Sequence, residues 1–477
     1  MVGMSFLGAV REIGDMDLII ALPNNLAGIV PIASISEPLE RAATAVAVAL
    51  ADADSSDSDA EDTTISGLPQ LDKLFHVGQL VRCVATSLEI VKGSKRIELS
   101  TKPSLVNVGI PSSAFVKGFH IGGCIESVED TGYVVSFGDH EIKGFAPIAE
   151  VSETLAVGAL VECVVQKMKG RVATVSLAKS AISEAVANTA VLPVTAIKPG
   201  VLVQGLVKRC NEQGAVVDIN GAIGTIDRYH LPKQLKISSR VTARVLWADS
   251  GARRLGLSLL PSLIKYDDMV APAHVPVGSK VNVEIVRIDG ELGMLVKVID
   301  SKPVVHGFVH ISRVADERVE KLEKRFTAGE KYPARVVGLS LLDGIVNISM
   351  APSVVNAQWL RLDDLKPGML VKCTIASVHP YGLLVNLTEH IRGLVPLLHL
   401  ADSRISNPVG KFKVGKSIEC RVLSVDSAKK RLFLTHKRTL LKTELPLLTS
   451  YEDAKKDLIV HGYILRVVVF LYECVFY

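Results

Sequence analysis

A short phrase recurs five times along this chain. Each version contains a glycine followed by apolar residues, and the five versions are LAGIVPIASI (26–35), IKGFAPIAEV (142–151), AIGTIDRYHL (222–231), VHGFVHISRV (305–314) and IRGLVPLLHL (391–400). Recurrence at a nearly constant interval indicates that one structural unit has been duplicated. A chain of 477 residues is also too long for one hydrophobic core, and its length suggests about three to five domains.

The residues around each phrase repeat as well. A strand with two small residues five apart and a second apolar strand precede the phrase, and two further strands follow it. The last strand of each unit ends on Ser or Thr: RIELS (96–100), VATVS (172–176), RLGLS (254–258), IVNIS (345–349) and RLFLT (431–435). Val, Ile and Leu at a period of two, interrupted by Gly and Asp turns, are typical of strands. Five short strands in each unit of roughly 75–90 residues predict an all-β fold of five-stranded Greek-key barrels, the OB-fold.

The repeat predicts five barrels and an incomplete sixth, arranged in series as a multidomain rod. The predicted domains are 1–104, 113–180, 195–262, 274–352, 362–440 and 448–477. An insertion near 40–64 should begin as an Ala-rich helix and continue as a disordered loop with an acidic run at 51–62. The sixth unit has too few strands to close, so its apolar strand either docks on the fifth barrel or is an artefactual end. Long helices, or one continuous sheet across the joints, would contradict this architecture.

The composition is globular and mildly basic. Apolar residues make up 48% and charged residues 22%, which excludes a wholly disordered chain. The net charge is +4, but six acids lie within 51–62, so the other residues hold 54 bases against 44 acids, or +10, which weakly favours a polyanionic partner. The first residues do not form a secretory leader, and the apolar run VVVFLY (467–472) is far shorter than the roughly 20 residues of a membrane helix. We therefore expect a soluble protein without a membrane partner.

One segment matches the phosphate-loop pattern GxxxxGKS. It is GKFKVGKS (410–417), and a loop of this kind needs a helix after it so that backbone amides point at the phosphates. A strand-like segment follows instead, and Gly415 occupies the slot of Gly78 and Gly158 in units that lack the Lys-Ser pair. The pattern therefore indicates a turn rather than a nucleotide site.

Three cysteines occupy one slot of the fourth strand. They are Cys83, Cys163 and Cys420, and because they belong to separate barrels they cannot share one metal ion. We predict that they are buried small side chains. No catalytic constellation is visible, so neither an enzymatic activity nor a cofactor is predicted.

Several segments carry a family resemblance. GSKVNVEIVRID (278–289) followed by GFVHISRV (307–314) resembles the S1 RNA-binding domain. The segments 366–402, 436–441 and 448–467 resemble the family of multi-S1-repeat pre-ribosomal RNA processing factors, called programmed cell death protein eleven in animals. The likeness covers nearly the whole chain.

The resemblance implies a non-enzymatic scaffold of ribosome biogenesis in the nucleolus of the nucleus. Its implied partners are precursor ribosomal RNA, bound as a single strand through tandem S1 domains, and other pre-ribosomal assembly factors. Members of the family are much longer, so the chain is expected to be a fragment or a truncated product. Two alternatives stay open: a protein-interaction scaffold with degenerate S1 repeats, and a general translation factor resembling bacterial ribosomal protein S1.

The resemblance also places aromatic side chains for RNA. The S1 pattern has one aromatic just before the glycine of strand two, where this chain has Ile13, Thr131, Gln213, Leu292 and Tyr381. It has another aromatic and a His on strand three, where this chain has the pairs Ile29/Pro31, Phe145/Pro147, Thr225/Asp227, Phe308/His310 and Leu394/Pro396. We therefore predict that barrels four and five contact RNA, and that barrels one and two are spacers or protein-binding surfaces.

The candidate RNA-binding residues combine aromatic rings with cations. Bases stack on aromatic rings for roughly 1–3 kcal/mol each, and Lys and Arg follow the phosphates. The candidates are Phe308, His310, Arg313, Tyr381, Arg392, Arg431, Arg228, Tyr229, His230, Arg254 and Phe145. Packing of Phe308 in the core and an ordinary surface position for His310 remain the alternative interpretations.

Overall fold

The structure is a computed structural model that describes residues 2–52, 69–91, 94–138, 141–151, 154–189, 192–211, 213–249, 251–269, 275–290, 292–302, 304–317, 319, 321–359, 361–388, 391–403, 408, 410–426, 431–443, 462–468 and 471–476. The chain forms two compact units. The first comprises Met1–His274 with Leu339–Val346, and the second comprises Val275–Gly338 with Asn347–Tyr477. Across the described ranges, no helix combines the length and apolar character that crossing a membrane requires.

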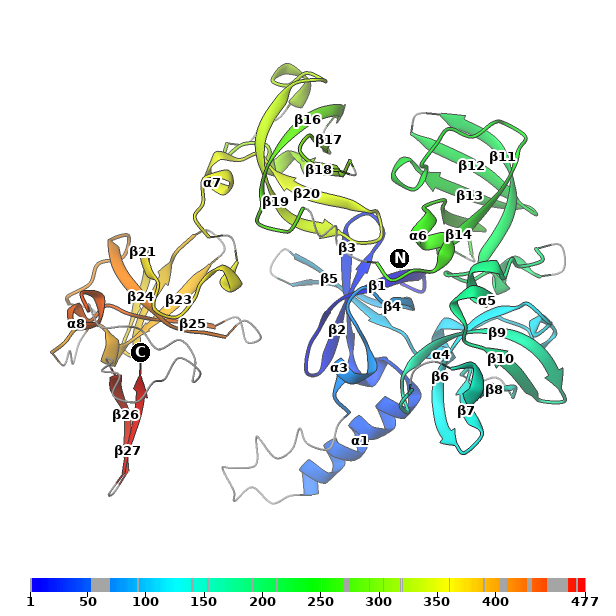
Figure 1. Ribbon diagram of the computed structural model, residues 1–477, viewed down its shortest axis with the longest axis horizontal. Coiled ribbons are helices and arrows are strands. Elements are labelled where there is room, and N and C mark those ends of the chain that lie inside the picture. The colour runs from blue at the N-terminus through cyan, green and yellow to red at the C-terminus, as the bar shows by residue number, and fades with distance from the viewer. Residues whose placement is uncertain are drawn as a thin grey trace. The chain divides into compact units, whose positions relative to one another are not determined.

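Three five-stranded barrels lie in the first unit (Figure 1). Barrel one consists of β1 (Ser5–Ile13), β2 (Asp17–Leu22), β3 (Leu26–Pro31), β4 (Leu80–Val91) and β5 (Ser94–Ser100). Barrel two consists of β6 (His120–Glu129), β7 (Gly132–Ser136), β8 (Lys143–Pro147), β9 (Leu160–Lys169) and β10 (Val172–Ser176). Barrel three consists of β11 (Leu202–Asn211), β12 (Gly214–Ile219), β13 (Ala222–Asp227), β14 (Arg240–Asp249) and β15 (Arg254–Ser258).

Two further barrels and a hairpin follow. Barrel four consists of β16 (Lys280–Asp289), β17 (Gly293–Val298), β18 (His306–His310), β19 (Lys331–Ser340) and β20 (Ile345–Ser349), and the tip of its last hairpin belongs to the first unit. Barrel five consists of β21 (Leu370–His379), β22 (Gly382–Asn386), β23 (Arg392–Pro396), β24 (Ser417–Asp426) and β25 (Arg431–Thr435). The incomplete sixth repeat contributes β26 (Gly462–Val468) and β27 (Leu471–Phe476), which within the described residues pair only with each other.

The barrels close in one common way, with strand one between strands two and four and strand three beside strand five. Barrels two, four and five are separate closed barrels, whereas barrels one and three share a ten-stranded sheet. The strands of barrel one and barrel three pair with each other at one place in that sheet, where β1 pairs with β14 at Ser5↔Ala248 and Phe6↔Trp247. Each of these two barrels still closes through pairing of its first and fourth strands, β1 with β4 and β11 with β14. The predicted all-β fold of tandem barrels is therefore confirmed.

The predicted rod is wrong for the first three barrels. In a rod, barrel three would not contact barrel one, whereas the β1–β14 ladder places the two directly against each other. Barrels two and three also share one hydrophobic cluster, which includes Ile121 and Val203. The side of barrel one contacts barrel two as well, since Ser36 Oγ donates to the carbonyl of Gly158 at 3.0 Å. Each of the three barrels therefore touches the other two.

The recurring glycine makes room inside the barrel. A Cβ at Gly28 would lie 2.5 Å from Leu99 of strand five, and a Cβ at Gly393 would lie 2.8 Å from Leu434. Both leucines are fully buried. The glycine of the phrase thus lets strand five place a large side chain in a narrow interior, as expected where backbones approach closely.

Short helices fill the connections. The predicted Ala-rich helix is confirmed as α1 (Glu37–Asp52), although it begins a few residues before the insertion, and most of the predicted acidic loop lies outside the described residues. A short helix follows each barrel: α4 (Pro103–Val106), α5 (Lys179–Glu184), α6 (Pro261–Lys265), α7 (Pro352–Val355) and α8 (Arg438–Leu441). A 3-10 turn follows each strand three: η1 (Ile32–Ser34), η4 (Ile148–Glu150), η6 (Arg228–His230), η7 (Ile311–Arg313) and η10 (Leu397–His399). The other short elements are α3 (Leu71–Leu74), η3 (Ser112–Ala114), η5 (Val194–Ala196), η8 (Leu322–Lys324) and η9 (Leu362–Asp364).

A buried arginine of β14 fastens α6 to barrel three. Arg244 is 0% exposed, and its guanidinium donates to the carbonyls of Gly200 at 2.8 Å, Leu263 at 3.0 Å and Ile264. Two of these carbonyls lie at the end of α6, where intrahelical donors run out, although that of Leu263 also accepts the Tyr266 amide at 3.1 Å. Burial lowers the pKa of Arg244 to about 10, so the side chain stays charged at neutral pH.

The same arrangement recurs in the second unit. Arg335 of β19 donates to the carbonyls of Gly278 at 2.9 Å, Val354 at 3.3 Å and Ala357 at 2.5 Å. Arg421 of β24 donates to the carbonyl of Leu441 at 3.1 Å. This strand-four arginine therefore ties a barrel to the helix that follows it in three of the five repeats.

A buried ion pair joins barrels one and two. Arg82 of β4 donates to both carboxylate oxygens of Glu162 of β9, with Nε–Oε1 at 2.9 Å and Nη2–Oε2 at 2.6 Å. Its Nη2 also lies 3.1 Å from Nε2 of His120, which is 2.8 Å from Glu162 Oε2. The side chains of Arg82, Glu162 and His120 are 3%, 13% and 0% exposed. Two barrels therefore share one desolvated charge cluster.

The cluster continues to barrel three. Tyr266, just after α6, meets the ring of His120 edge to face at 5.7 Å between centroids. The guanidinium carbon of Arg244 lies 4.9 Å from the centroid of the Tyr266 ring, in cation–π range. Polar side chains thus connect all three barrels of the first unit.

Burial and charge set the protonation of the cluster. Burial and the Arg82 charge lower the pKa of His120 to about 4. Burial alone would raise the pKa of Glu162, but Arg82 and His120 outweigh it and lower that pKa to about 2. At neutral pH the cluster therefore holds a charged Arg82, a charged Glu162 and a neutral His120.

The first unit should lose stability as the pH falls from about 6.5 to about 4. The unfolded His120 takes up a proton near its ordinary pKa, whereas the folded residue does so only near 4. The free energy of unfolding should therefore fall by up to about 3 kcal/mol across this window, as measured by denaturant unfolding at a series of pH values. His120→Gln should flatten that slope, and an unchanged slope in this variant would contradict the assignment.

Candidate nucleic-acid interface

One outward-facing position on each strand forms a row across each barrel, called here the outer row. The cross-strand pairs identify the members of each row, which are written below in the order of strands one, two, three, five and four. In barrel two it is Ser127, Val134, Phe145, Thr174 and Lys167; in barrel three it is Arg209, Val216, Thr225, Gly256 and Trp247; in barrel five it is Ser377, Leu384, Leu394, Phe433 and Ser424. In barrel four the described part is Arg287, Leu295 and Phe308. The outer rows of barrels two, three, four and five each carry an aromatic side chain.

The two predicted strand-three phenylalanines lie on the outer face. Phe145 is half-buried while its neighbour Ala146 is 1% exposed, and Phe308 is half-buried while Val309 is 0% exposed. A Cβ at Gly132 would lie 2.7 Å from the tip of the Phe145 ring, and the matching distance in barrel four, from position 293 to Phe308, is 2.8 Å. Each ring therefore lies over the first glycine of strand two, outside the core.

Barrel four keeps the predicted histidine at the surface. His310 is exposed, and its Nδ1 lies 2.8 Å from Ser312 Oγ and accepts the Ser312 amide at 3.2 Å. These contacts cap η7 and fix the ring orientation. Arg313 is also exposed, and its carbonyl accepts the Met350 amide at 2.8 Å. The loop that follows Phe308 is thereby held with its imidazole and guanidinium exposed to solvent.

Barrel five carries an exposed pair of stacked rings. Tyr381 is 57% exposed and stacks on His379, with centroids 4.9 Å apart and planes within 7°. His379 Nε2 lies 2.9 Å from Oγ of Ser377, the first member of the outer row. The sequence predicted Tyr381 but missed His379, although the H-P-Y spacing across the turn could have indicated it.

The two predicted cations of barrel five stand at the first residues of strands three and five. Arg392 begins β23 and Arg431 begins β25, and both side chains are exposed. Phe433 lies two residues after Arg431 in the outer row, beside Leu394 of strand three. The sequence missed Phe433 because the S1 pattern has its aromatics on strands two and three.

The predicted cluster of barrel three is only partly at the surface. Arg228 and Tyr229 are half-buried in η6, and Asp227 Oδ1 accepts the amide of Tyr229 at 3.3 Å. Arg254 is exposed at the start of β15.

His230 must be removed from the candidate set. It is 3% exposed, with Nδ1 at 2.9 Å from Ser258 Oγ and Nε2 at 3.1 Å from Asp343 Oδ1 within the first unit. Since both ring nitrogens already have buried partners, this histidine supports the fold and does not face solvent.

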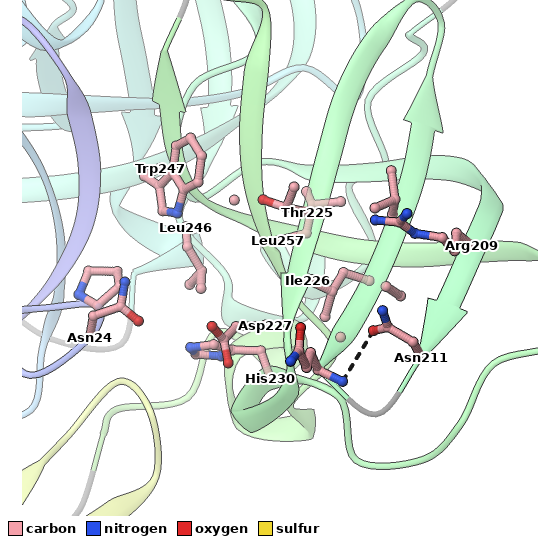
Figure 2. A pocket seen from close by; sticks show the side chains of 16 residues that line it. Asn24, Arg209, Asn211, Thr225, Ile226, Asp227, His230, Leu246, Trp247 and Leu257 are labelled. Carbon is pink, nitrogen blue, oxygen red and sulfur yellow. Dashed lines mark hydrogen bonds between the residues drawn. The ribbon is translucent and has the colours of Figure 1, made fainter. Parts of the chain in front are cut away.

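A cavity of about 300 Å³ lies on the outer row of barrel three (Figure 2). Its lining includes Arg209, Thr225 and Trp247 of the row, together with polar side chains at the β11–β12 turn. Figure 2 shows Trp247 and Arg209 on opposite sides of Thr225. The sequence did not single out Trp247, since it stands on strand four.

The other motifs have structural roles. Strand β24 begins at Ser417, the last residue of the phosphate-loop pattern, so a strand stands where a nucleotide loop needs a helix. The predicted burial of Cys83, Cys163 and Cys420 is confirmed, since all three are 0% exposed. Among the residues that the structure describes, no group of three or more His, Cys, Asp or Glu side chains could hold a metal ion.

Two segments match known domain families. Residues 270–360 match the RRP5 OB-fold domain, and residues 365–435 match the RRP5 S1 domain. Both matches lie where the structure has barrels four and five.

Comparison with whole proteins extends the likeness along the chain. The human protein RRP5 homolog is 30% identical over 98% of this chain and 25% of its own length. The rRNA biogenesis protein rrp5 of Schizosaccharomyces pombe is 32% identical over 95% of this chain and 28% of its own length. The small ribosomal subunit protein bS1 of Leuconostoc lactis is 24% identical over 48% of this chain and 55% of its own length. The chain thus spans about a quarter of the length of the RRP5 relatives, and the likeness to bS1 is weaker and shorter.

Proposed function

This chain belongs to the RRP5 family of rRNA biogenesis proteins, and on that premise we propose that it binds precursor ribosomal RNA as a single strand, with several barrels at once. In this proposal the chain is a scaffold that holds RNA for processing and performs no chemistry on it. The two alternatives, a general translation factor and a pure protein-interaction scaffold, are not favoured. The family likeness extends along 98% of the chain, whereas the likeness to bS1 covers 48%.

The recurrence of aromatic side chains in the outer rows carries the proposal. A single exposed aromatic residue is common on protein surfaces. Phe145, Trp247, Phe308 and Phe433, however, lie in the same row of four separate barrels. Stacking of unpaired bases is the function of such rings on OB barrels.

The cations near these rings would follow the phosphates. Arg313, Arg392, Arg431 and Arg254 have exposed side chains in barrels three to five. Each stacked base contributes roughly 1–3 kcal/mol, so one barrel alone holds RNA weakly. Linked barrels bind more tightly, since each engaged barrel raises the effective RNA concentration at the next.

Tyr381→Ala should weaken binding of single-stranded RNA by about 5- to 150-fold, which is the loss of one stacked base. The ring is exposed and stacks on His379, outside the buried cluster of barrel five, so its removal leaves the barrel core untouched. Fluorescence anisotropy of a labelled oligoribonucleotide against the full chain measures this change. The affinity of the parent should also fall steeply with salt.

Leu292→Ala is the matched control. Leu292 occupies the same turn position in barrel four and is 68% exposed, but it has no aromatic face. This variant should bind RNA as the parent does. Equal losses in both variants would mean that Tyr381 does not stack on a base, and affinity independent of salt would overturn RNA binding itself.

The family premise also supports a nucleolar location and contact with other assembly factors. Both remain parts of the proposal, because the chain covers only 25% of the human relative. Imaging of the tagged chain beside a nucleolar marker tests the location, and an exclusively cytoplasmic signal would contradict it.

A further inference from the structure

Barrel three has lost both aromatic positions of the S1 pattern. Gln213 stands before the strand-two glycine and Thr225 stands on strand three. By the pattern alone this barrel has no ring on which a base could stack. The outer row nevertheless contains an aromatic side chain, on strand four instead.

Trp247 reaches the outer face because of a bulge in β14. The ladder with β15 skips Leu246, so Val245 pairs with Leu257 and Trp247 pairs with Gly256. Leu246 is 2% exposed, whereas Trp247 is half-buried. A one-residue bulge changes which side chains face outward.

Gly256 makes space for the indole. A Cβ at this position would overlap Nε1 of Trp247, so the ring lies across strand five where a side chain would otherwise stand. In barrels two and five the same slot holds Thr174 and Phe433. Trp247 therefore lies over a glycine of the adjacent strand, as Phe145 does in barrel two.

A cation stands at the other end of the row. Arg209 is exposed and lies beside Val216, which lies beside Thr225. In the described part of the chain no ion pair engages Arg209, whereas Arg287 in the matching slot of barrel four pairs with Asp289. The cavity between Arg209 and Trp247 has a volume of about 300 Å³, which suits one small ligand unit.

We propose that this cavity is a nucleotide-binding site in which an unpaired RNA base stacks on Trp247 and its phosphate pairs with Arg209. The site rests on the proposed RNA-binding function and moves the stacking ring from strands two and three to strand four. It makes barrel three a further contact for RNA beside barrels four and five. Thr225 forms the floor between the two groups, and Asn211 and Gln213 also line the cavity, where they could bond the edge of the base.

Tryptophan fluorescence tests the site directly. The chain has two tryptophans, Trp247 and Trp359, so the full chain with Trp359→Phe reports Trp247 alone. Titration with a single-stranded oligoadenylate of about ten nucleotides should quench the emission to saturation. An abasic ribose-phosphate chain of equal length should leave the emission unchanged, since it offers charge but no base.

Two substitutions of Trp247 separate the effect of base stacking from the effect of side-chain volume. In the chain with native Trp359, Trp247→Phe keeps an aromatic face and should lower RNA affinity by less than about three-fold, whereas Trp247→Leu should lower it by about ten-fold or more. Thr225→Glu leaves Trp247 in place, adds a negative charge to the floor of the cavity and should weaken binding as well. It tests the site even where Trp247→Leu impairs folding.

The failures are distinguishable. RNA binding by anisotropy with unchanged Trp247 emission, or with equal affinity for Trp247→Leu and Trp247→Phe, would overturn this site and leave the proposed function standing. Quenching by the abasic chain would also overturn it, since stacking would then not be the contact. Absence of RNA binding in every readout would overturn the proposed function itself.

Discussion

Glu162→Gln should lower the free energy of unfolding of the first unit by about 3–5 kcal/mol. The exchange keeps the size of the side chain but removes the carboxylate that neutralises Arg82, whose side chain is 3% exposed. A guanidinium does not release its proton at accessible pH, so its charge would remain buried without a counter-ion. Denaturant unfolding of the full chain, with the first unit followed by Trp247 emission in the Trp359→Phe background, measures the loss.

Two control variants test whether the loss comes from burying an unpaired charge. Glu126→Gln breaks the ion pair with Lys143 in the same barrel, whose side chains are 33% and 43% exposed, and should cost about 0–1 kcal/mol. The double variant Arg82→Met with Glu162→Leu removes both buried charges and should recover most of the loss. If Glu162→Gln costs no more than Glu126→Gln, the Arg82–Glu162 pair is not desolvated.

The barrels themselves could be predicted from sequence because every unit repeats the same physical pattern. In β21 the buried side chains Val371, Cys373 and Ile375 alternate with exposed ones, which is the period of a strand with one face inside. Comparison between units also located the interior cysteines, since a slot that stays small and apolar in several copies belongs to the core.

The candidate site could be predicted only where the chain follows the S1 pattern. Phe308, His310 and Tyr381 follow it, and the structure places them on the outer surface of their barrels. Trp247 does not follow it, because its outward direction depends on a bulge that shifts the register of β14 by one residue. The same bulge recurs in barrels one, two and five, where it turns Ser87, Lys167 and Ser424 outward, so the repeat gives the position of the bulge but no expectation of an aromatic side chain there.

The contacts between barrels could not be predicted because no repeat pattern encodes them. Arg82 and Glu162 occupy the same slot, just before the strand-four cysteine, and nothing in either unit says that the two slots meet. His230 failed as a site residue for the same reason, since its partner Asp343 lies 113 residues away. The repeated pattern specifies the interior of each barrel, whereas the contacts between barrels that it does not specify are made by individual charged and hydrogen-bonding side chains.

Arg244→Met should lower the free energy of unfolding of the first unit by about 2–6 kcal/mol. Its guanidinium donates to the carbonyls of Gly200, Leu263 and Ile264, and the residue is 0% exposed. Methionine keeps the apolar stem but donates nothing, so the carbonyls of Gly200 and Ile264 lose this donor, at roughly 1–3 kcal/mol each, whereas the carbonyl of Leu263 keeps the Tyr266 amide at 3.1 Å. The end of α6 should loosen, and limited proteolysis after Lys265 should become faster.

Arg421→Met in barrel five is the comparison that isolates the cause. Arg421 occupies the same slot but donates to one carbonyl, that of Leu441, and should cost about 1–2 kcal/mol. Arg244→Lys keeps the charge on a single nitrogen that cannot reach three carbonyls in different directions, so its cost should lie between the two. Equal losses for Arg244→Met and Arg421→Met would mean that the number of carbonyls does not matter, and that the strand-four arginine stabilises each joint by packing of its stem alone.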